Sequence, residues 1–204
     1  KTGENSRRLL NLGLPEAESW FLDMVCRYIE EVPLDYFRHD GGSPPLGFWQ
    51  RADPPDRVGM TEIRYIEALY RIWDELLARY PAMMIEGCWG GGRRMDLESL
   101  SRCHTYWATD LYGPGNLIAR QRHTYGANLY LPGNYLNVVL HAQDPNRYAL
   151  RSQHGCALCL AWDPREKDFD LALAVAQVEE FKALRHLAVG DFYPLTQYSI
   201  RPDE

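Results

Sequence analysis

The chain has 204 residues, 46% of them hydrophobic and 25% charged, which is ordinary for a folded protein with one sizeable core. Its formal net charge is -6 and its basic residues are scattered among acidic ones, so nucleic acid is a disfavoured partner. No apolar run approaches the roughly 18 residues that cross a bilayer, so we also expect no membrane segment and no membrane partner.

The number and spacing of the cysteines bear on the cellular compartment of the protein and on whether it binds a metal. Five of them, an odd number, do not form a disulfide framework, so we expect reduced thiols and a cytoplasmic location. Cys156 and Cys159 have the spacing of a redox or zinc pair, but they lie in an apolar strand-like run and no second ligand pair accompanies them. We therefore expect no metal at this pair, and we expect no organic cofactor either.

The N-terminal part of the chain predicts a helix, a strand and a long loop. Residues 15–31 carry apolar side chains at helical spacing behind Pro15, a residue that suits the first helical turn. Residues 34–40 predict a strand that ends at Asp40. The Pro- and Gly-rich residues 41–59 predict a loop, and loops of this length often serve as functional lids or walls.

The middle of the chain contains the clearest helix and the most unusual turn. Residues 61–80 have a continuous apolar face, and Thr61 is the expected N-cap. The apolar residues 82–85 predict a buried strand that ends in the turn 86–92. Three consecutive glycines in this turn let the backbone approach a ligand closely.

Strands and helices continue to alternate through the C-terminal half. The strand-like residues 105–110 end on the carboxylate of Asp110. Further helical patterns follow at residues 116–128, 147–154 and 169–187, with an apolar strand at residues 156–162. This alternation predicts a parallel α/β fold whose sites lie at the carboxyl ends of the strands. About five β/α units are present, roughly three fewer than a closed eight-stranded barrel contains.

Three motifs together resemble a known family. They are residues 36–40 (YFRHD), 85–97 (IEGCWGGGRRMDL) and 106–110 (YWATD). In this order and spacing they resemble the melibiase type of glycoside hydrolase, family 36 of clan D, which is the α-galactosidase group. The resemblance implies a (β/α)8 TIM barrel of which residues 1–190 form the C-terminal part, about the last five β/α units. Residues 191–204 would then start a C-terminal β domain.

The resemblance also implies the roles of individual residues. The family's nucleophile corresponds to Asp40 and its acid/base to Asp110, while its substrate contacts correspond to Arg38, Cys88 and Gly91. These roles imply an enzyme that cleaves terminal α-galactosides with retention, through a covalent glycosyl-enzyme. Its partner would be an α-galactoside or an oligosaccharide substrate.

The residues themselves suit this chemistry. Retention requires one carboxylate that attacks the anomeric carbon and one acid that protonates the leaving oxygen, about 5 Å apart. Asp40 and Asp110 can meet because both end parallel strands, and Arg38 would keep the nucleophile ionised. Trp49 and Trp89 could stack on the faces of sugar rings, although packing in the core is an equally good interpretation of both.

Several neighbouring positions depart from the family pattern. Gly42 occupies a position where many relatives carry Asn, and Ala108 and Thr109 replace the usual residues before the acid/base. These departures leave open an α-N-acetylgalactosaminidase, a transglycosylase, or a non-catalytic fragment or sugar-binding pseudoenzyme. Because half a barrel exposes two sheet edges, we expect the chain alone to be unstable or to self-associate as a homo-oligomer.

Overall fold

The computed structural model describes residues 8–41, 44–111, 115–141 and 147–201. Within these ranges the chain is an α/β fold whose strands pair in parallel. The chain divides into two compact units. Unit 1 contains residues 1–89 and 94–103, and unit 2 contains residues 90–93 and 104–204.

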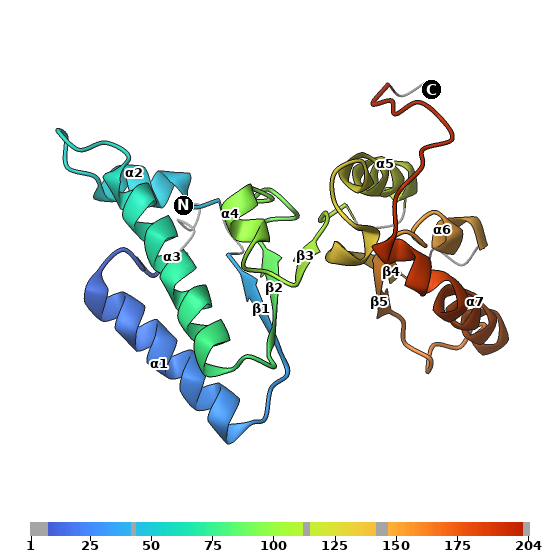
Figure 1. The fold of residues 1–204 in the computed structure, drawn as a ribbon, viewed down its shortest axis with the longest axis horizontal. Helices are drawn as coiled ribbons and strands as arrows, with labels where there is room; N and C mark the ends of the chain where they lie inside the picture. The colour runs from blue at the N-terminus through green and yellow to red at the C-terminus, as the bar shows by residue number, and fades with distance from the viewer. Residues whose placement is uncertain (1–7, 42–43, 112–114, 142–146, 202–204) are drawn as a thin grey trace, which may run out of the picture. The chain divides into compact units, whose positions relative to one another are not determined.

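Unit 1 contains one pair of parallel strands and the helices that precede and follow them. Its elements are α1 (Pro15–Glu31), β1 (Tyr36–Asp40), α2 (Leu46–Ala52), α3 (Met60–Arg79), β2 (Met84–Cys88) and α4 (Leu97–Leu100). β1 and β2 are in register over their whole length, which pairs Asp40 with Cys88 at their carboxyl ends. The long helices α1 and α3 lie side by side (Figure 1).

The apolar face predicted for the long helix of unit 1 forms its core. Along α3 the buried side chains recur every three or four residues: Tyr65, Ala68, Leu69, Ile72, Trp73 and Leu76. The start of this helix differs from the prediction. Its N-cap is Gly59, at φ +92°, and the carboxylate of Asp53 accepts hydrogen bonds of 2.8 Å from the backbone N–H groups of both Gly59 and Thr61. The prediction that Thr61 is the N-cap was therefore wrong.

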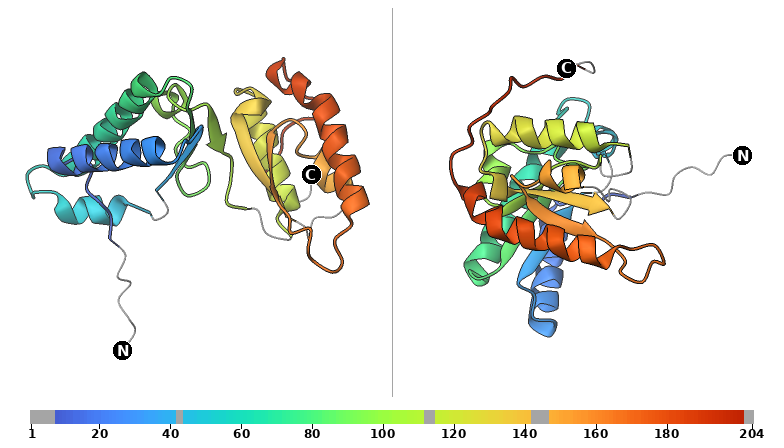
Figure 2. Two further views of the ribbon diagram at one scale, coloured as in Figure 1. Left: turned by 90° about the horizontal axis from the view of Figure 1, so that it is seen from below. Right: turned by 90° about the vertical axis from the view of Figure 1, so that its right-hand side faces the viewer.

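Unit 2 contains three parallel strands in chain order. Its elements are β3 (Thr105–Trp107), α5 (Leu117–Asn128), η1 (Gly133–Tyr135), β4 (Leu136–His141), α6 (Arg147–Arg151), β5 (Ala157–Ala161), α7 (Leu171–Leu184) and η2 (Arg185–Val189). β4 pairs with both β3 and β5, and α7 runs alongside the β4–β5 pair (Figure 2). Leu136, Val138 and Leu140 are almost fully buried, so β4 is central to this unit.

A helix and a strand are among the elements that were not predicted from the sequence. The predicted loop at residues 41–59 contains the short helix α2, and β4 was not predicted to be a strand. Residues 191–201 form no regular secondary structure and pack against α5, where the ring of Tyr125 stacks on Tyr198 at 5.8 Å and meets Phe192 edge-on at 5.4 Å. The C-terminal β domain therefore stays a prediction.

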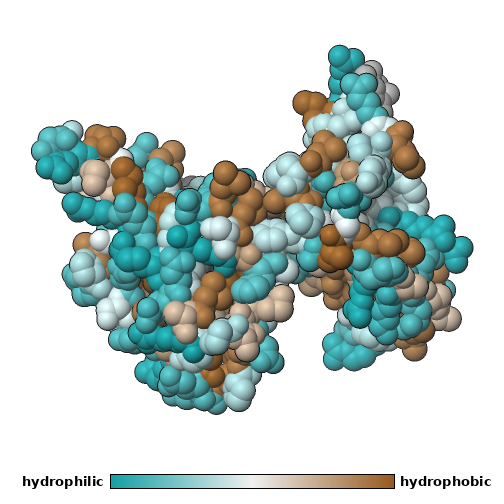
Figure 3. All heavy atoms as spheres, in the orientation of Figure 1, coloured by the Kyte–Doolittle hydropathy of each residue, from teal (hydrophilic) through white to brown (hydrophobic). Residues whose placement is uncertain are grey.

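Both units leave apolar side chains on their surfaces, visible as brown patches in Figure 3. In unit 2 they concentrate on α7 and the residues that follow it: Leu171, Val175, Leu184, Leu187 and Val189 are between 39% and 67% exposed. Exposed apolar patches of this kind typically pack against another element or another chain.

None of the described helices is long and apolar enough to span a membrane. None of the five cysteines is in a disulfide.

Candidate active site

The carboxyl ends of β1 and β2 place Asp40 beside a buried carboxylate and a thiol. Arg38 and Asp40 are two residues apart on β1, so their side chains lie on the same face of the strand. The Arg38 guanidinium donates to Glu86 Oε2 at 3.3 Å, to Cys88 Sγ at 3.2 Å and to Asp40 Oδ2 at 3.5 Å. Burial opposes the charge of Arg38, but Cys88, Glu86 and Asp40 together raise its pKa. Arg38 therefore supplies a permanent positive charge next to Asp40.

The Glu86 carboxylate is the buried partner of this cluster. It is only 2% exposed, whereas the Arg38 side chain is 33% exposed. We expect Glu86→Gln to lower the free energy of unfolding by about 1–3 kcal/mol, because the substitution removes the buried negative charge that pairs with the Arg38 guanidinium. Chemical denaturation measures the difference. Glu75→Gln is the control, since it removes an exposed ion pair with Arg79 of 2.7 Å. Equal losses in both variants would contradict the prediction.

His39 lies on the opposite face of β1, inside an aromatic cluster. Trp73 Nε1 donates to His39 Nδ1 at 3.2 Å, and the Phe21 ring stacks on His39 at 5.4 Å. Burial lowers the pKa of His39 to about 4, although the Asp40 charge acts in the opposite direction. The histidine therefore packs as a neutral ring beneath the strand that carries Asp40.

This buried histidine predicts a pH dependence of stability. Its pKa in the folded chain, about 4, is below the ordinary value of 6.5. As the pH falls below 6.5 the unfolded chain binds a proton that the folded chain cannot bind, so the free energy of unfolding falls until the pH reaches about 4. The full loss is about 3 kcal/mol. Unfolding measured across this range should show a smaller loss for His39→Gln but the wild-type loss for His123→Gln, whose histidine is exposed. An unaltered pH dependence in His39→Gln would refute the assignment.

Trp49 and Trp89 are buried in unit 1. They are 4% and 5% exposed, and Tyr65 packs against both rings. The Arg94 guanidinium lies 4.4 Å from the centroid of Trp89 and 5.3 Å from that of Trp49. The burial and ring contacts of Trp49 and Trp89 agree with packing in the core. A role of these side chains in sugar binding stays a prediction. A Cβ on Gly41 would lie 2.5 Å from the Trp89 ring, so the glycine after Asp40 makes room for this packing.

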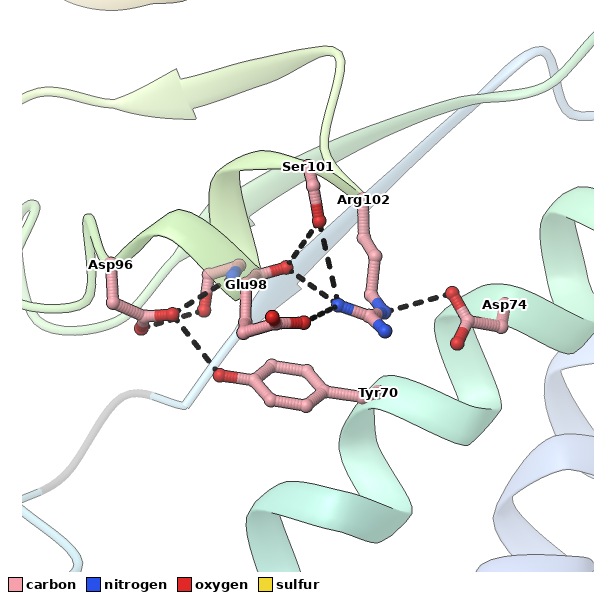
Figure 4. Close-up of polar contacts among 7 residues, drawn as sticks. Tyr70, Asp74, Asp96, Glu98, Ser101 and Arg102 are labelled. Atoms are coloured by element: carbon pink, nitrogen blue, oxygen red, sulfur yellow. Dashed lines mark hydrogen bonds and ion pairs between the residues drawn. The ribbon is translucent and has the colours of Figure 1, made fainter.

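A polar network attaches the residues after the glycine turn to α3 (Figure 4). Asp96 caps α4 by accepting from Ser99 N at 2.9 Å and also accepts from the Tyr70 hydroxyl at 3.1 Å. Arg102 pairs with Asp74 at 2.8 Å and with Glu98 at 2.7 Å, and it lies 4.7 Å from the centroid of the Tyr70 ring. The network fixes the segment that leaves the turn. The sequence signal that would have revealed it is the N-cap pattern Asp96-x-x-Ser99.

Asp110 lies in unit 2, just beyond β3. Its Oδ1 accepts a hydrogen bond of 3.0 Å from the indole Nε1 of Trp107, which is 6% exposed. The backbone of Ala108 continues the pairing by donating to Asn137 O at 2.9 Å, and Thr109 is 5% exposed. Ala108 and Thr109 therefore extend and bury the strand end that presents the Asp110 carboxylate. Gly42, the third departure from the family pattern, is outside the described residues.

The structure groups the predicted site residues by unit. Arg38, Asp40 and Cys88 contact or pair with one another in unit 1. Gly91 lies against Asp110 in unit 2, since a Cβ at residue 91 would be 2.8 Å from Asp110 Cγ. Each group provides a donor to its aspartate. The Arg38 guanidinium stabilises the Asp40 anion, and the Trp107 indole orients the Asp110 carboxyl.

Comparison with known proteins identifies the family. A family model described as Melibiase matches residues 1–154. The chain belongs to the melibiase family. It is 26% identical over 198 residues to alpha-galactosidase 1 of Pediococcus pentosaceus, an alignment that covers 92% of this chain and 26% of that enzyme. The chain therefore spans about a quarter of the length of this relative.

Solved structures of the same family share the fold. The GH36 alpha-galactosidase AgaA from Geobacillus stearothermophilus superposes with a TM-score of 0.73 at 20% identity, over 93% of this chain and 28% of that one. A variant of AgaA in complex with raffinose gives a TM-score of 0.70 at 21% identity, over 95% of this chain and 29% of that one. The predicted α/β class is confirmed, and the chain covers a portion of the melibiase TIM barrel.

Proposed function

We propose that this melibiase chain carries the nucleophile and the acid/base of a retaining glycoside hydrolase that cleaves terminal α-galactosides. The contact between the Arg38 guanidinium, Asp40 and Cys88 at the carboxyl ends of β1 and β2 is the main support. It gives Asp40 a fixed cation, as a carboxylate nucleophile needs. The names of the relatives and the raffinose bound to AgaA point to the same substrate class.

In this proposal an Asp40 oxygen attacks the anomeric carbon of the galactoside. As the new C–O bond forms, the glycosidic C–O bond breaks and Asp110 gives its proton to the leaving oxygen. Water then attacks the same carbon and Asp110 takes up a proton from it. The Asp40 carboxylate leaves, so two inversions give net retention.

Substrate recognition is assigned to groups beside the nucleophile. Cys88 and Arg38 lie within hydrogen-bond distance of each other next to Asp40, and both can interact with sugar hydroxyls. Arg38 is 33% exposed, so part of its guanidinium is accessible. We propose no metal and no cofactor, because two carboxylates supply the nucleophile and the proton. A cytoplasmic location and self-association stay predictions.

The test is hydrolysis of an aryl α-galactoside by the protein that carries this chain, with the anomer of the first product read by NMR. α-Galactose as the first product, with little turnover of the matched α-N-acetylgalactosaminide, supports the proposal. β-Galactose first would contradict retention. Faster turnover of the N-acetylated substrate would favour the alternative sugar specificity, and a folded protein that binds galactose without turnover would favour a sugar-binding pseudoenzyme.

A further inference from the structure

Gly91, in the glycine turn after β2, lies against Asp110, whereas its neighbour Gly90 does not. Gly90 and Gly91 both have left-handed backbones, at φ +57° and +74°. A Cβ added to Gly91 would lie 2.4 Å from Asp110 N, 2.8 Å from its Cγ and 3.0 Å from its Cβ. A Cβ added to Gly90 would meet nothing closer than Arg93 Cδ at 3.6 Å. The two glycines share a backbone conformation, but only Gly91 leaves space for the Asp110 carboxyl.

The Trp107 indole restricts the same carboxyl from another position. Its Nε1 donates to Asp110 Oδ1 at 3.0 Å, and the ring is held by burial at the end of β3. Because an indole N–H can only donate, it favours an unprotonated Oδ1. The proton of a neutral Asp110 carboxyl is therefore carried by Oδ2.

We propose that Gly91 and Trp107 are positioning residues that hold the acid/base Asp110 in one orientation, with Oδ1 on the indole and Oδ2 presented for proton transfer. This inference rests on the proposed role of Asp110. It gives Gly91 a function apart from the substrate contact implied by family resemblance: the missing side chain at residue 91 is space for the acid/base. A general acid depends on such alignment, because a misplaced carboxyl transfers its proton poorly.

The first test is spectroscopic and needs no turnover. The indole 1H–15N signal of Trp107, assigned by its loss in Trp107→Phe, should move with pH as Asp110 ionises, and this movement should disappear in Asp110→Asn. In Gly91→Ala the movement should be at least halved, while Gly90→Ala, which strains the backbone in the same way, should keep it. A Trp107 signal that does not follow Asp110, or equal effects of the two alanines, would overturn the proposal.

The second test compares substrates with good and poor leaving groups. A residue with a merely structural role would lower the activity on both substrates equally. An activated aryl α-galactoside needs little protonation on departure, whereas raffinose needs full protonation. Gly91→Ala and Trp107→Phe should lower kcat/KM for raffinose at least tenfold more than for the aryl substrate. Gly90→Ala should keep the wild-type ratio. Equal losses on both substrates would refute positioning of the acid. A wild-type protein that shows the indole titration but no turnover would contradict the proposed function and leave the geometric inference standing.

Discussion

Replacing Asp40 with Asn is expected to lower kcat for every α-galactoside by a factor on the order of 10⁴ to 10⁶, because an amide cannot form the glycosyl-enzyme. The loss should be the same for activated and poor leaving groups, since both reach the product through this intermediate. The Asn side chain keeps the shape at the end of β1, so the midpoint of thermal unfolding should stay close to that of the wild type. Initial rates and a melting curve on the same sample measure both quantities.

A matched control and a rescue experiment sharpen this prediction. Asp35→Asn removes an exposed carboxylate just before the same strand and should leave kcat within about twofold of the wild type. Asp40→Gly with added azide should form β-galactosyl azide, because azide enters from the face that the missing carboxylate has left. Undiminished hydrolysis by Asp40→Asn, or azide products of the opposite anomer, would exclude Asp40 as the nucleophile.

Asp110→Ala should give a loss that depends on the leaving group. For raffinose, whose leaving oxygen must be protonated, we expect kcat/KM to fall by about 10² to 10⁴. For an activated aryl α-galactoside the first step proceeds without the acid, so a glycosyl-enzyme should accumulate and a burst of phenol should precede slow turnover. Stopped-flow absorbance resolves the burst from the steady state.

The control for this prediction is another carboxylate that follows a parallel strand. Asp163 lies just beyond β5 and pairs with Arg165 at 2.8 Å, so Asp163→Ala tests whether any aspartate in this setting has the effect. It should show no burst and no change in the ratio of the two substrates. Azide added to Asp110→Ala should give α-galactosyl azide, the anomer opposite to that from Asp40→Gly. A uniform loss on both substrates would remove Asp110 from the role of acid/base.

The long helices and the strand that ends at Asp40 were predictable because their signals are local. The apolar residues of α3 recur at helical spacing, so tertiary contacts only confirm what the periodicity requires. Asp40 and Asp110 were identified by their motifs. The structure places Asp40 at the carboxyl end of β1 and Asp110 three residues beyond β3, which is shorter than the predicted strand. The α2 helix was missed because prolines and glycines surround it, and β4 because its six residues follow a polar turn.

Contacts between segments distant in sequence were not predictable. No periodicity reveals that Asp53 caps a helix by bonding to residues six and eight positions later. Nor does any local pattern reveal that Arg94 stacks on Trp89 and Trp49. The proximity of Gly91 to Asp110 likewise depends on how the turn folds onto the end of β3. These contacts determine the surroundings of the proposed catalytic residues, so the motifs predicted roles for these residues but not the contacts around them.

Covalent trapping tests the central claim most directly. A fluorinated α-galactosyl fluoride forms the glycosyl-enzyme quickly but releases it slowly, so the intact protein should gain the mass of one fluorogalactosyl group. Digestion and mass spectrometry should then place that group on the carboxylate of Asp40, with no label in Asp40→Asn and slower release in Asp110→Ala. Label on any other residue, or an active protein that hydrolyses the reagent without ever carrying it, would contradict the assignment of Asp40 as the nucleophile.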